Sequence, residues 1–181
     1  MASYHLWDIN EQKISREIVE SVARLNYDYL ARISIQNGTY ELYGVKENAG
    51  ILPPQAGSYE EDWYKRAAPH LHPEDRVDFM EQMAIDRMVK EIENRDRFSF
   101  VYRLMERDGV VRYKRMTISR LDASYLIAAR ADVTRETEEE MRKNLELRRA
   151  LEEARKADDA KSQFLARMSR EVRAPMDALF G

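Results

Sequence analysis

Cysteine is absent from this 181-residue sequence. Disulfide bonds and thiol chemistry are therefore excluded, and a cytosolic compartment, where disulfides are rare, fits the composition. Long apolar runs are missing as well, since no stretch approaches the roughly 20 residues that a membrane helix needs. The chain also has no signal-peptide pattern. We therefore expect a cytoplasmic protein, with membrane contact only through unseen parts of a longer parent protein.

An excess of basic residues is likewise missing. The 30 Lys and Arg residues are outnumbered by 33 Asp and Glu, so the net charge is −3. Proteins that bind nucleic acid usually present a basic face to the phosphates, so nucleic acid is not an expected partner. The length suits one domain of ordinary size with an extension.

Apolar spacing predicts a first helix over residues 9–25. Ile14, Ile18, Val22 and Leu25 fall on one face of it at helical period. A helix with one apolar face needs a surface to cover. We expect this one to lie on a sheet or to pair with a second copy of itself.

A hairpin follows this helix. The two runs 27–35 and 39–43 are rich in aromatic and β-branched residues. They flank Asn37-Gly38, the strongest two-residue turn signal. Residues 44–58 hold three glycines and two adjacent prolines, so they are predicted to form a loop.

The middle of the chain reads as helical from residue 59 to 94. A short helix over 59–68 carries Trp63, and a new helix starts at His72-Pro73, with proline at its first position. One apolar stripe is expected along that second helix, made by Val77, Met80, Ala84, Met88 and Ile92. Three strands are then predicted over 98–105, 110–120 and 123–133.

Three short motifs lie within residues 10–134: the helix start His72 to Asp75, the Asp108-Gly109 hairpin, and the terminal Asp132-Val133-Thr134. Their order and spacing resemble those of a PAS domain. The resemblance implies an α+β fold, a five-stranded antiparallel sheet with helices on one face. It also implies a pocket under the helices, and coupling of the last strand to the following helix through Asp132, Val133 and Thr134. We expect residues 1–26 to form an N-terminal helix and 27–134 the sensory domain.

The same resemblance limits which ligands the pocket could hold. A flavin-thiol or cinnamoyl-thioester photosensor of this family needs a cysteine, and the chain has none, so a thiol-linked chromophore is excluded. Haem sensors of this family use an axial histidine on the central helix, and residues 76–94 contain none. A small metabolite or no ligand at all stays open. The candidate pocket residues, which core packing would explain equally, are Met83, Phe100, Tyr102, Tyr113 and Met116.

His70 and His72, with Glu74 and Asp75 close by, are candidate ligands for a metal. A turn followed by a helix start explains these residues better, because Pro73 directly follows His72. No metal is expected here.

Residues 135–160 are charged and predicted to be helical. Met141 and Leu145 form one apolar stripe, and Leu147 and Leu151 start another, an offset typical of a coiled-coil stutter. A helix of about 40 residues is about 60 Å long, too long for one small domain to cover. We therefore expect a homodimer through residues 135–173.

The last stretch, residues 161–181, reads KSQFLARMSREVRAPMDALFG. It resembles the phosphoacceptor helix of sensor histidine kinases, sharing Lys161, Ser162, Phe164, Leu165, Ala166, Met168, Ser169, Glu171, Arg173, Pro175, Ala178 and Gly181. Arg170 stands where the family has its phosphorylated histidine, and Ala174 where it has the threonine that positions water. A guanidinium stays protonated and has no lone pair to accept a phosphoryl group. Glu171 beside it then has no acceptor to activate, and no catalytic residue is expected in this chain.

These observations predict the cytoplasmic sensory module of a sensor histidine kinase in two-component signalling, not itself competent for histidine phosphorylation. For a parent protein, the resemblance implies the kinase and a response regulator as downstream partners. Whether the chain belongs to an enzyme stays open. Two alternatives remain, a phosphotransferase component with another acceptor residue and a ligand-free dimerisation module.

Overall fold

A computed structural model describes the backbone of residues 17–180 and the side chains of residues 17–171. The chain divides into two compact units, Met1–Thr134 and Arg135–Gly181. Each unit is described separately below.

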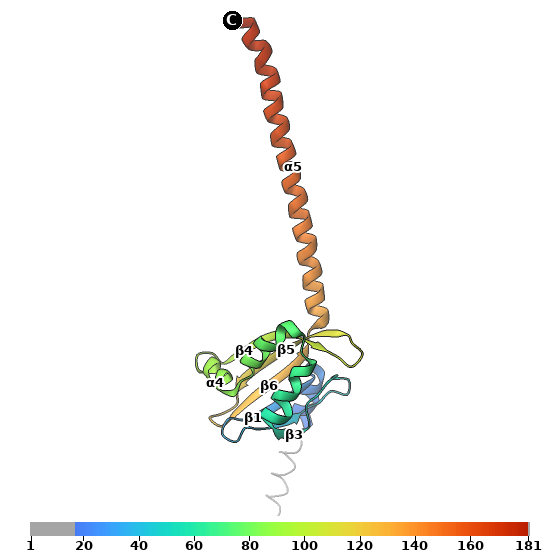
Figure 1. Cartoon of the computed structure of the whole chain (residues 1–181), viewed down its shortest axis with the longest axis vertical. Coiled ribbons are helices and arrows are strands. Elements are labelled where there is room, and N and C mark those ends of the chain that lie inside the picture. The colour runs from blue at the N-terminus through green and yellow to red at the C-terminus, as the bar shows by residue number, and fades with distance from the viewer. Residues whose placement is uncertain (1–16, 181) are drawn as a thin grey trace, which may run out of the picture. The chain divides into compact units, whose positions relative to one another are not determined.

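The first unit is built on one antiparallel sheet of six strands in the order β3-β2-β1-β6-β5-β4 (Figure 1). The strands are β1 (Tyr29–Ser34), β2 (Thr39–Tyr43), β3 (Ala56–Ser58), β4 (Arg97–Met105), β5 (Val111–Arg120) and β6 (Tyr125–Asp132). The first and last strands, β1 and β6, are neighbours in its centre. Residues near 30 and near 130 are therefore brought together.

Helical segments between β3 and β4 cover one face of this sheet (Figure 1). They are η1 (Tyr59–Tyr64), α2 (Lys65–Ala67), η2 (Ala68–His70), η3 (Pro73–Asp75), α3 (Arg76–Gln82) and α4 (Ile85–Glu93). Buried side chains of the sheet, such as Ile33, Met116 and Ile118, pack in one core with Trp63 and Met88 of these segments. The α+β fold class, with helices on one face of an antiparallel sheet, is confirmed.

The sheet has one strand more than the five predicted. Ala56–Ser58 lies inside the predicted loop 44–58 but pairs with residues 39–41 of β2. Its residues have low β propensity, so no strand pattern was visible in the sequence. Pairing with the free edge of β2 decides the conformation instead.

The stripe predicted along one long helix is also wrong in part, because that helix is broken. The backbone of Ala84 is extended, with φ −64° and ψ 132°, and it separates α3 from α4. Val77 is 78% exposed, whereas Met88 is fully buried. The break turns the two halves differently toward the sheet, so a single helical period cannot describe them.

The helix start at His72 is as predicted and is held by side-chain contacts. The Nδ1 atom of His72 accepts a hydrogen bond from the Glu74 N–H at 3.4 Å. The Asp75 carboxylate binds both the backbone N–H and the guanidinium of Arg103 on β4. These bonds lower the pKa of Asp75 and tie the helix start to the sheet.

The described part of the N-terminal helix, residues 17–26, does not place its predicted stripe on the sheet. Ile18, Val22 and Leu25 are more than half exposed, while Ala23 is buried. Ala23 packs closely on Gly44, whose φ is +57°. Pairing of the stripe with a second copy stays a prediction, and Ile14 lies outside the described residues.

The second unit is the single helix α5 (Thr134–Phe180), which starts at the last residue of the first unit. Its apolar residues Met141, Leu145, Leu147, Leu151, Phe164, Leu165 and Met168 are between 41% and 68% exposed. Within one chain, therefore, roughly half of the surface of each of these side chains stays exposed.

The close packing of Ala23 on Gly44 yields a stability prediction. A Cβ added to Gly44 would lie 2.6 Å from the Ala23 Cβ, whereas one added to Gly38, at a similar φ of +59°, would meet nothing within 4 Å. We expect Gly38→Ala to cost about 1 kcal/mol for the left-handed backbone. Gly44→Ala should cost about 1–3 kcal/mol more because of the clash. Urea unfolding measures both, and equal losses would show that the helix does not pack there.

Candidate functional site

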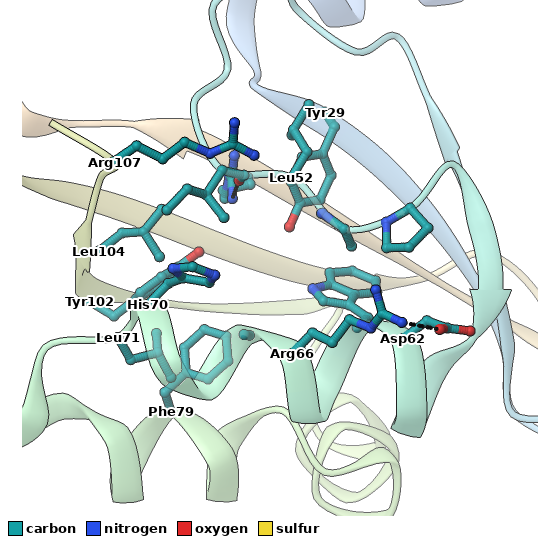
Figure 2. A pocket seen from close by; sticks show the side chains of 16 residues that line it. Tyr29, Leu52, Asp62, Arg66, His70, Leu71, Phe79, Tyr102, Leu104 and Arg107 are labelled. Carbon is teal, nitrogen blue, oxygen red and sulfur yellow. Dashed lines mark hydrogen bonds and ion pairs between the residues drawn. The ribbon is translucent and has the colours of Figure 1, made fainter.

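A cavity of about 340 Å³ opens between the inner sheet face and the helical segments (Figure 2). Figure 2 shows Tyr29 and Phe79 on opposite sides of it, with Arg107, His70 and Arg66 around it. The lining residues are Tyr29, Ile51, Leu52, Pro53, Pro54, Asp62, Trp63, Arg66, Ala67, His70, Leu71, Phe79, Tyr102, Leu104, Arg107 and Arg130.

Aromatic rings form much of the cavity wall. Trp63 lies 5.8 Å from Tyr29 and 5.3 Å from Tyr59 between ring centroids, both in edge-to-face geometry. The ring centroids of Phe79 and Tyr102 lie 4.6 Å apart. The π-helical turn η1 is what brings Trp63 onto the sheet, and the Ser58 hydroxyl caps it by accepting from the Glu61 N–H at 3.4 Å.

Residues 51–54 close one side of the cavity, and hydrogen bonds fix them there. The Ile51 carbonyl accepts from Arg130 Nη1 at 2.8 Å, and the Ile51 N–H donates to Glu106 Oε2 at 3.0 Å. The Tyr40 hydroxyl donates to the Pro54 carbonyl at 2.9 Å. The wall is therefore formed before any ligand arrives, which lowers the entropic cost of binding.

The wall carries hydrogen-bond donors on Tyr29, Tyr102 and its arginines, and one carboxylate, that of Asp62. Burial raises the pKa of Tyr29 and of Tyr102, so both hydroxyls stay protonated at neutral pH. The Arg130 guanidinium lies over the Tyr29 ring, 4.5 Å from its centroid. Burial alone would lower the pKa of Arg130, but Tyr29, Tyr102 and Asp28 raise it on balance.

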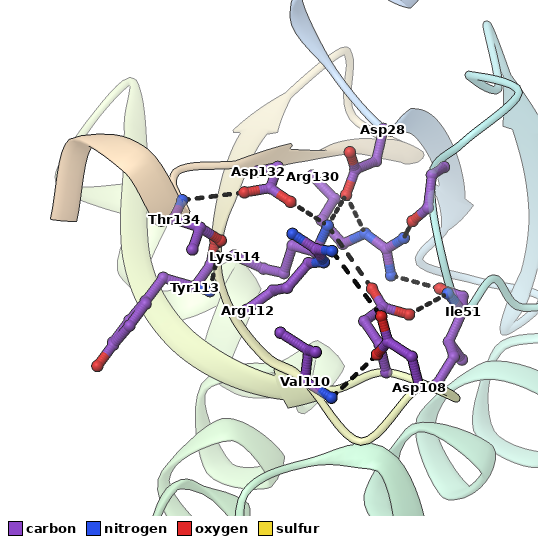
Figure 3. Close-up of polar contacts among 12 residues, drawn as sticks. Asp28, Ile51, Asp108, Val110, Arg112, Tyr113, Lys114, Arg130, Asp132 and Thr134 are labelled. Carbon is purple, nitrogen blue, oxygen red and sulfur yellow. Dashed lines mark hydrogen bonds and ion pairs between the residues drawn. The ribbon is translucent and has the colours of Figure 1, made fainter. Parts of the chain in front are cut away.

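Behind the wall, Arg130 joins a buried ionic network (Figure 3). Asp28 Oδ2 accepts from Arg130 Nε at 3.0 Å and from Lys114 Nζ at 2.9 Å. The side chains of these three residues are 5% exposed or less. Glu106 Oε1 lies 3.8 Å from the same Lys114 Nζ. Buried charges require such pairing, because an unpaired one would cost several kcal/mol.

The network extends to the first residue of α5. Lys114 Nζ donates to Asp132 Oδ2 at 2.9 Å, and Asp132 Oδ1 accepts from the Thr134 N–H at 2.9 Å (Figure 3). The Thr134 hydroxyl accepts from the Tyr113 N–H at 3.0 Å, and the Val133 N–H donates to the Tyr113 carbonyl at 2.9 Å. Asp132, Val133 and Thr134, the predicted coupling residues, thus join β5 to the start of α5.

Of the predicted pocket residues, the structure places Tyr102 in the cavity wall. Met83 and Met116 are buried in the neighbouring core, and Phe100, partly buried, packs against that core. Tyr113 neighbours Lys114 in β5 and so belongs to the opposite sheet face, and Figure 3 shows its ring pointing away from the network. A ligand role for these residues stays a prediction.

The residues at the phosphoacceptor positions lie in α5. Arg170 and Glu171 are exposed, and Arg170 Nε donates to the Ala166 carbonyl of its own helix at 3.3 Å. Ala174 also lies in α5, beyond the described side chains.

Within the part of the chain that the structure describes, no group of three or more His, Cys, Asp or Glu side chains is placed to hold a metal ion. Among the same residues, no helix combines the length and the apolar character needed to cross a bilayer.

Sequence reasoning missed the charged residues of the site. Lys114 lies two positions before Met116, and Arg130 lies two positions after Ala128, so each shares a strand face with buried apolar residues. A charge on an apolar strand face signals a buried partner. That signal was present, but it could not tell that the partner of both would be Asp28.

The Asp132 contacts predict a pH dependence of stability. Burial alone would raise the pKa of Asp132, but hydrogen bonds from Thr134 and Lys114 lower it to about 2, against about 3.9 in an unfolded chain. The carboxylate therefore stabilises the fold above pH 4, and this contribution disappears as the pH falls toward 2. Since the Asp132 side chain is 36% exposed, solvent screens these contacts, and we expect a contribution of about 1 kcal/mol.

In the Asp132→Asn variant, the unfolding free energy should therefore fall by about 1 kcal/mol less than in the unmodified chain between about pH 5 and pH 2. The control Asp96→Asn removes an exposed carboxylate without a hydrogen bond or ion pair among the described residues, and should follow the unmodified chain. Denaturant unfolding at each pH measures the difference, and identical slopes for both variants would contradict it.

Comparisons with known proteins complete this description. No family model matches the chain, and no curated protein matches it. Solved structures do: a sensory box histidine kinase/response regulator from Burkholderia thailandensis E264 has 20% identity and a TM-score of 0.46, covering 74% of this chain and 98% of its own. The N-terminal domain of a diguanylate cyclase with PAS/PAC sensor from Marinobacter aquaeolei has 20% identity and a TM-score of 0.39, covering 60% and 97%.

An RNA-binding light-oxygen-voltage receptor has 16% identity and a TM-score of 0.41, covering 67% of this chain and 33% of its own. At such identities and TM-scores, function must be argued from the residues of this chain.

Proposed function

We propose that this chain is the cytoplasmic PAS sensory module of a histidine-kinase-type protein. A cue at the cavity changes the contacts of the last strand, and α5 carries the change toward an output domain. The module pairs with a second copy through residues 135–173. It does not accept a phosphoryl group itself, because Arg170 occupies the acceptor position.

One observation carries this proposal: the cavity wall and the first turn of α5 share one chain of charge contacts, buried at Arg130, Asp28 and Lys114 and partly exposed at Asp132. Arg130 faces the cavity and binds Asp28, Asp28 binds Lys114, and Lys114 binds Asp132. Asp132 in turn accepts from the Thr134 N–H. A ligand that repositions Arg130 thus alters the charge available to the residue that starts the helix.

Two features of α5 support the pairing. Its 47 residues correspond to a helix about 70 Å long. In a single chain, the apolar side chains of this helix are largely exposed to water. From residue 147 onward, Leu147, Leu151 and Ala154 are followed by Leu165 and Met168 at coiled-coil spacing. The Met141 and Leu145 stripe is offset from this seam, and a register change costs least at such an offset.

The pairing predicts a homodimer of the full chain. Leu151→Asp with Leu165→Asp places two charges on the seam and should convert the dimer to a monomer. The matched control Arg149→Asp with Gln163→Asp changes positions on the opposite side of the same helix. Sedimentation velocity measures the mass of each. A monomeric unmodified chain would contradict the pairing, as would equal loss in both variants.

The signalling role is tested in a fusion in which the chain replaces the sensor and first acceptor helix of an active histidine kinase. With labelled ATP, this fusion should take no stable label on the residues of this chain, whereas its Arg170→His variant should be labelled. Deleting residues 147–150 in that variant should change the level of label, because four residues rotate the seam. Circular dichroism confirms that the sensory unit stays folded.

Two results would overturn this role. Label on the unmodified chain would favour a phosphotransferase with another acceptor residue. An unchanged label after the deletion would show that α5 transmits nothing by rotation or register.

A further inference from the structure

We propose that the cavity binds a small organic anion, a carboxylate carried on an aromatic or similarly flat apolar body. This rests on the proposed sensory function and names its ligand class. Three properties of the wall carry it: its charge, its rings and its size.

The charge of the wall is opposite to that of the chain. Three arginines line the cavity, Arg66, Arg107 and Arg130, against the single carboxylate of Asp62. The whole chain carries a net charge of −3. Cations gathered at a concave site in an otherwise acidic protein raise the local concentration of anions.

The three arginines differ in their partners. Arg130 is bound to Asp28, and Arg66 Nη2 lies 3.6 Å from Asp62 Oδ1. Asp62 is held in turn, because its Oδ2 accepts from the Ser58 N–H at 3.0 Å. Arg107 makes no hydrogen bond or ion pair with any other residue that the structure describes. Its guanidinium is therefore available to an incoming carboxylate, which it can bind with two parallel hydrogen bonds.

The rings supply the surface for the apolar part of the ligand. Trp63 is 3% exposed and Tyr102 is 4% exposed, so their orientations are fixed by packing. Leu52, Pro53 and Pro54 face them from the loop that closes the cavity. An aromatic body between these surfaces gains offset or edge-to-face ring contacts. A fully polar anion would leave this apolar wall uncovered.

The volume limits the ligand to a small molecule. About 340 Å³ is near the lower end of the roughly 300–1,000 Å³ typical of ligand pockets. The ligand class is therefore a one-ring acid of the benzoate, phenylacetate or phenylpropionate type.

The test uses Trp63 as a reporter. The chain has two tryptophans, so the Trp7→Phe variant leaves Trp63 as the single fluorophore. Titrations with benzoate, phenylacetate and 3-phenylpropionate are compared with titrations of the three matching neutral amides. At least one acid should change the Trp63 emission and bind about tenfold more tightly than its amide, the size expected for a charged hydrogen bond.

Arg107→Gln separates anion recognition from apolar contact. It should weaken binding of that acid about tenfold and leave binding of the amide unchanged. The control Arg76→Gln removes the same charge from an exposed position on α3 away from the cavity, and should bind like the parent. Arg107 is exposed, so its replacement should leave the fold intact, which circular dichroism checks.

Three outcomes would overturn the inference: no acid binds, an acid and its amide bind equally, or Arg107→Gln weakens both alike. None of them touches the proposed signalling role, because the fusion measures label without any added ligand. If the fusion fails while the acid binds, the cavity is an anion site in a module with another output.

Discussion

The site depends on the carboxylate of Asp28, because two buried cations bind to it. Arg130 and Lys114 approach the same oxygen at 3.0 and 2.9 Å. A buried cation without a partner would cost several kcal/mol, so displacing Arg130 or Lys114 from Asp28 is unfavourable. Asp28 itself is held by the sheet, since its N–H donates to the Arg130 carbonyl at 2.6 Å. The central strands are thereby locked at the place where the cavity wall is made.

Hydrogen bonds extend from Asp28 and its two cations toward the cavity and toward the helix. Toward the cavity, Arg130 holds the loop by donating to the carbonyls of Ala49 and Ile51. Toward the helix, Lys114 holds Asp132, which accepts from the first N–H of α5. Arg130 of the cavity wall and the Thr134 N–H at the start of α5 therefore belong to one connected set of charge contacts.

The cavity lies between the helical segments and the sheet, where the pocket was predicted, but most of its lining residues differ from the predicted ones. The sequence pointed to methionines and aromatic residues of strands and helices as the lining. Tyr102 lies there, while Met83 and Met116 fill the core beside it. The difference arises because periodicity assigns a residue to a face of an element, and cannot say which part of that face is filled by neighbours.

By itself, the sequence determined the α+β class, the hairpin around Gly38, the helix start at His72 and the long charged helix, because these follow from local spacing, turn chemistry and capping. Only the tertiary structure decided that Ala56–Ser58 becomes a strand, that the helix breaks at Ala84, and that Asp28 meets Arg130. Those outcomes depend on residues up to 102 positions apart, and no local pattern records which distant edge or charge a segment will meet.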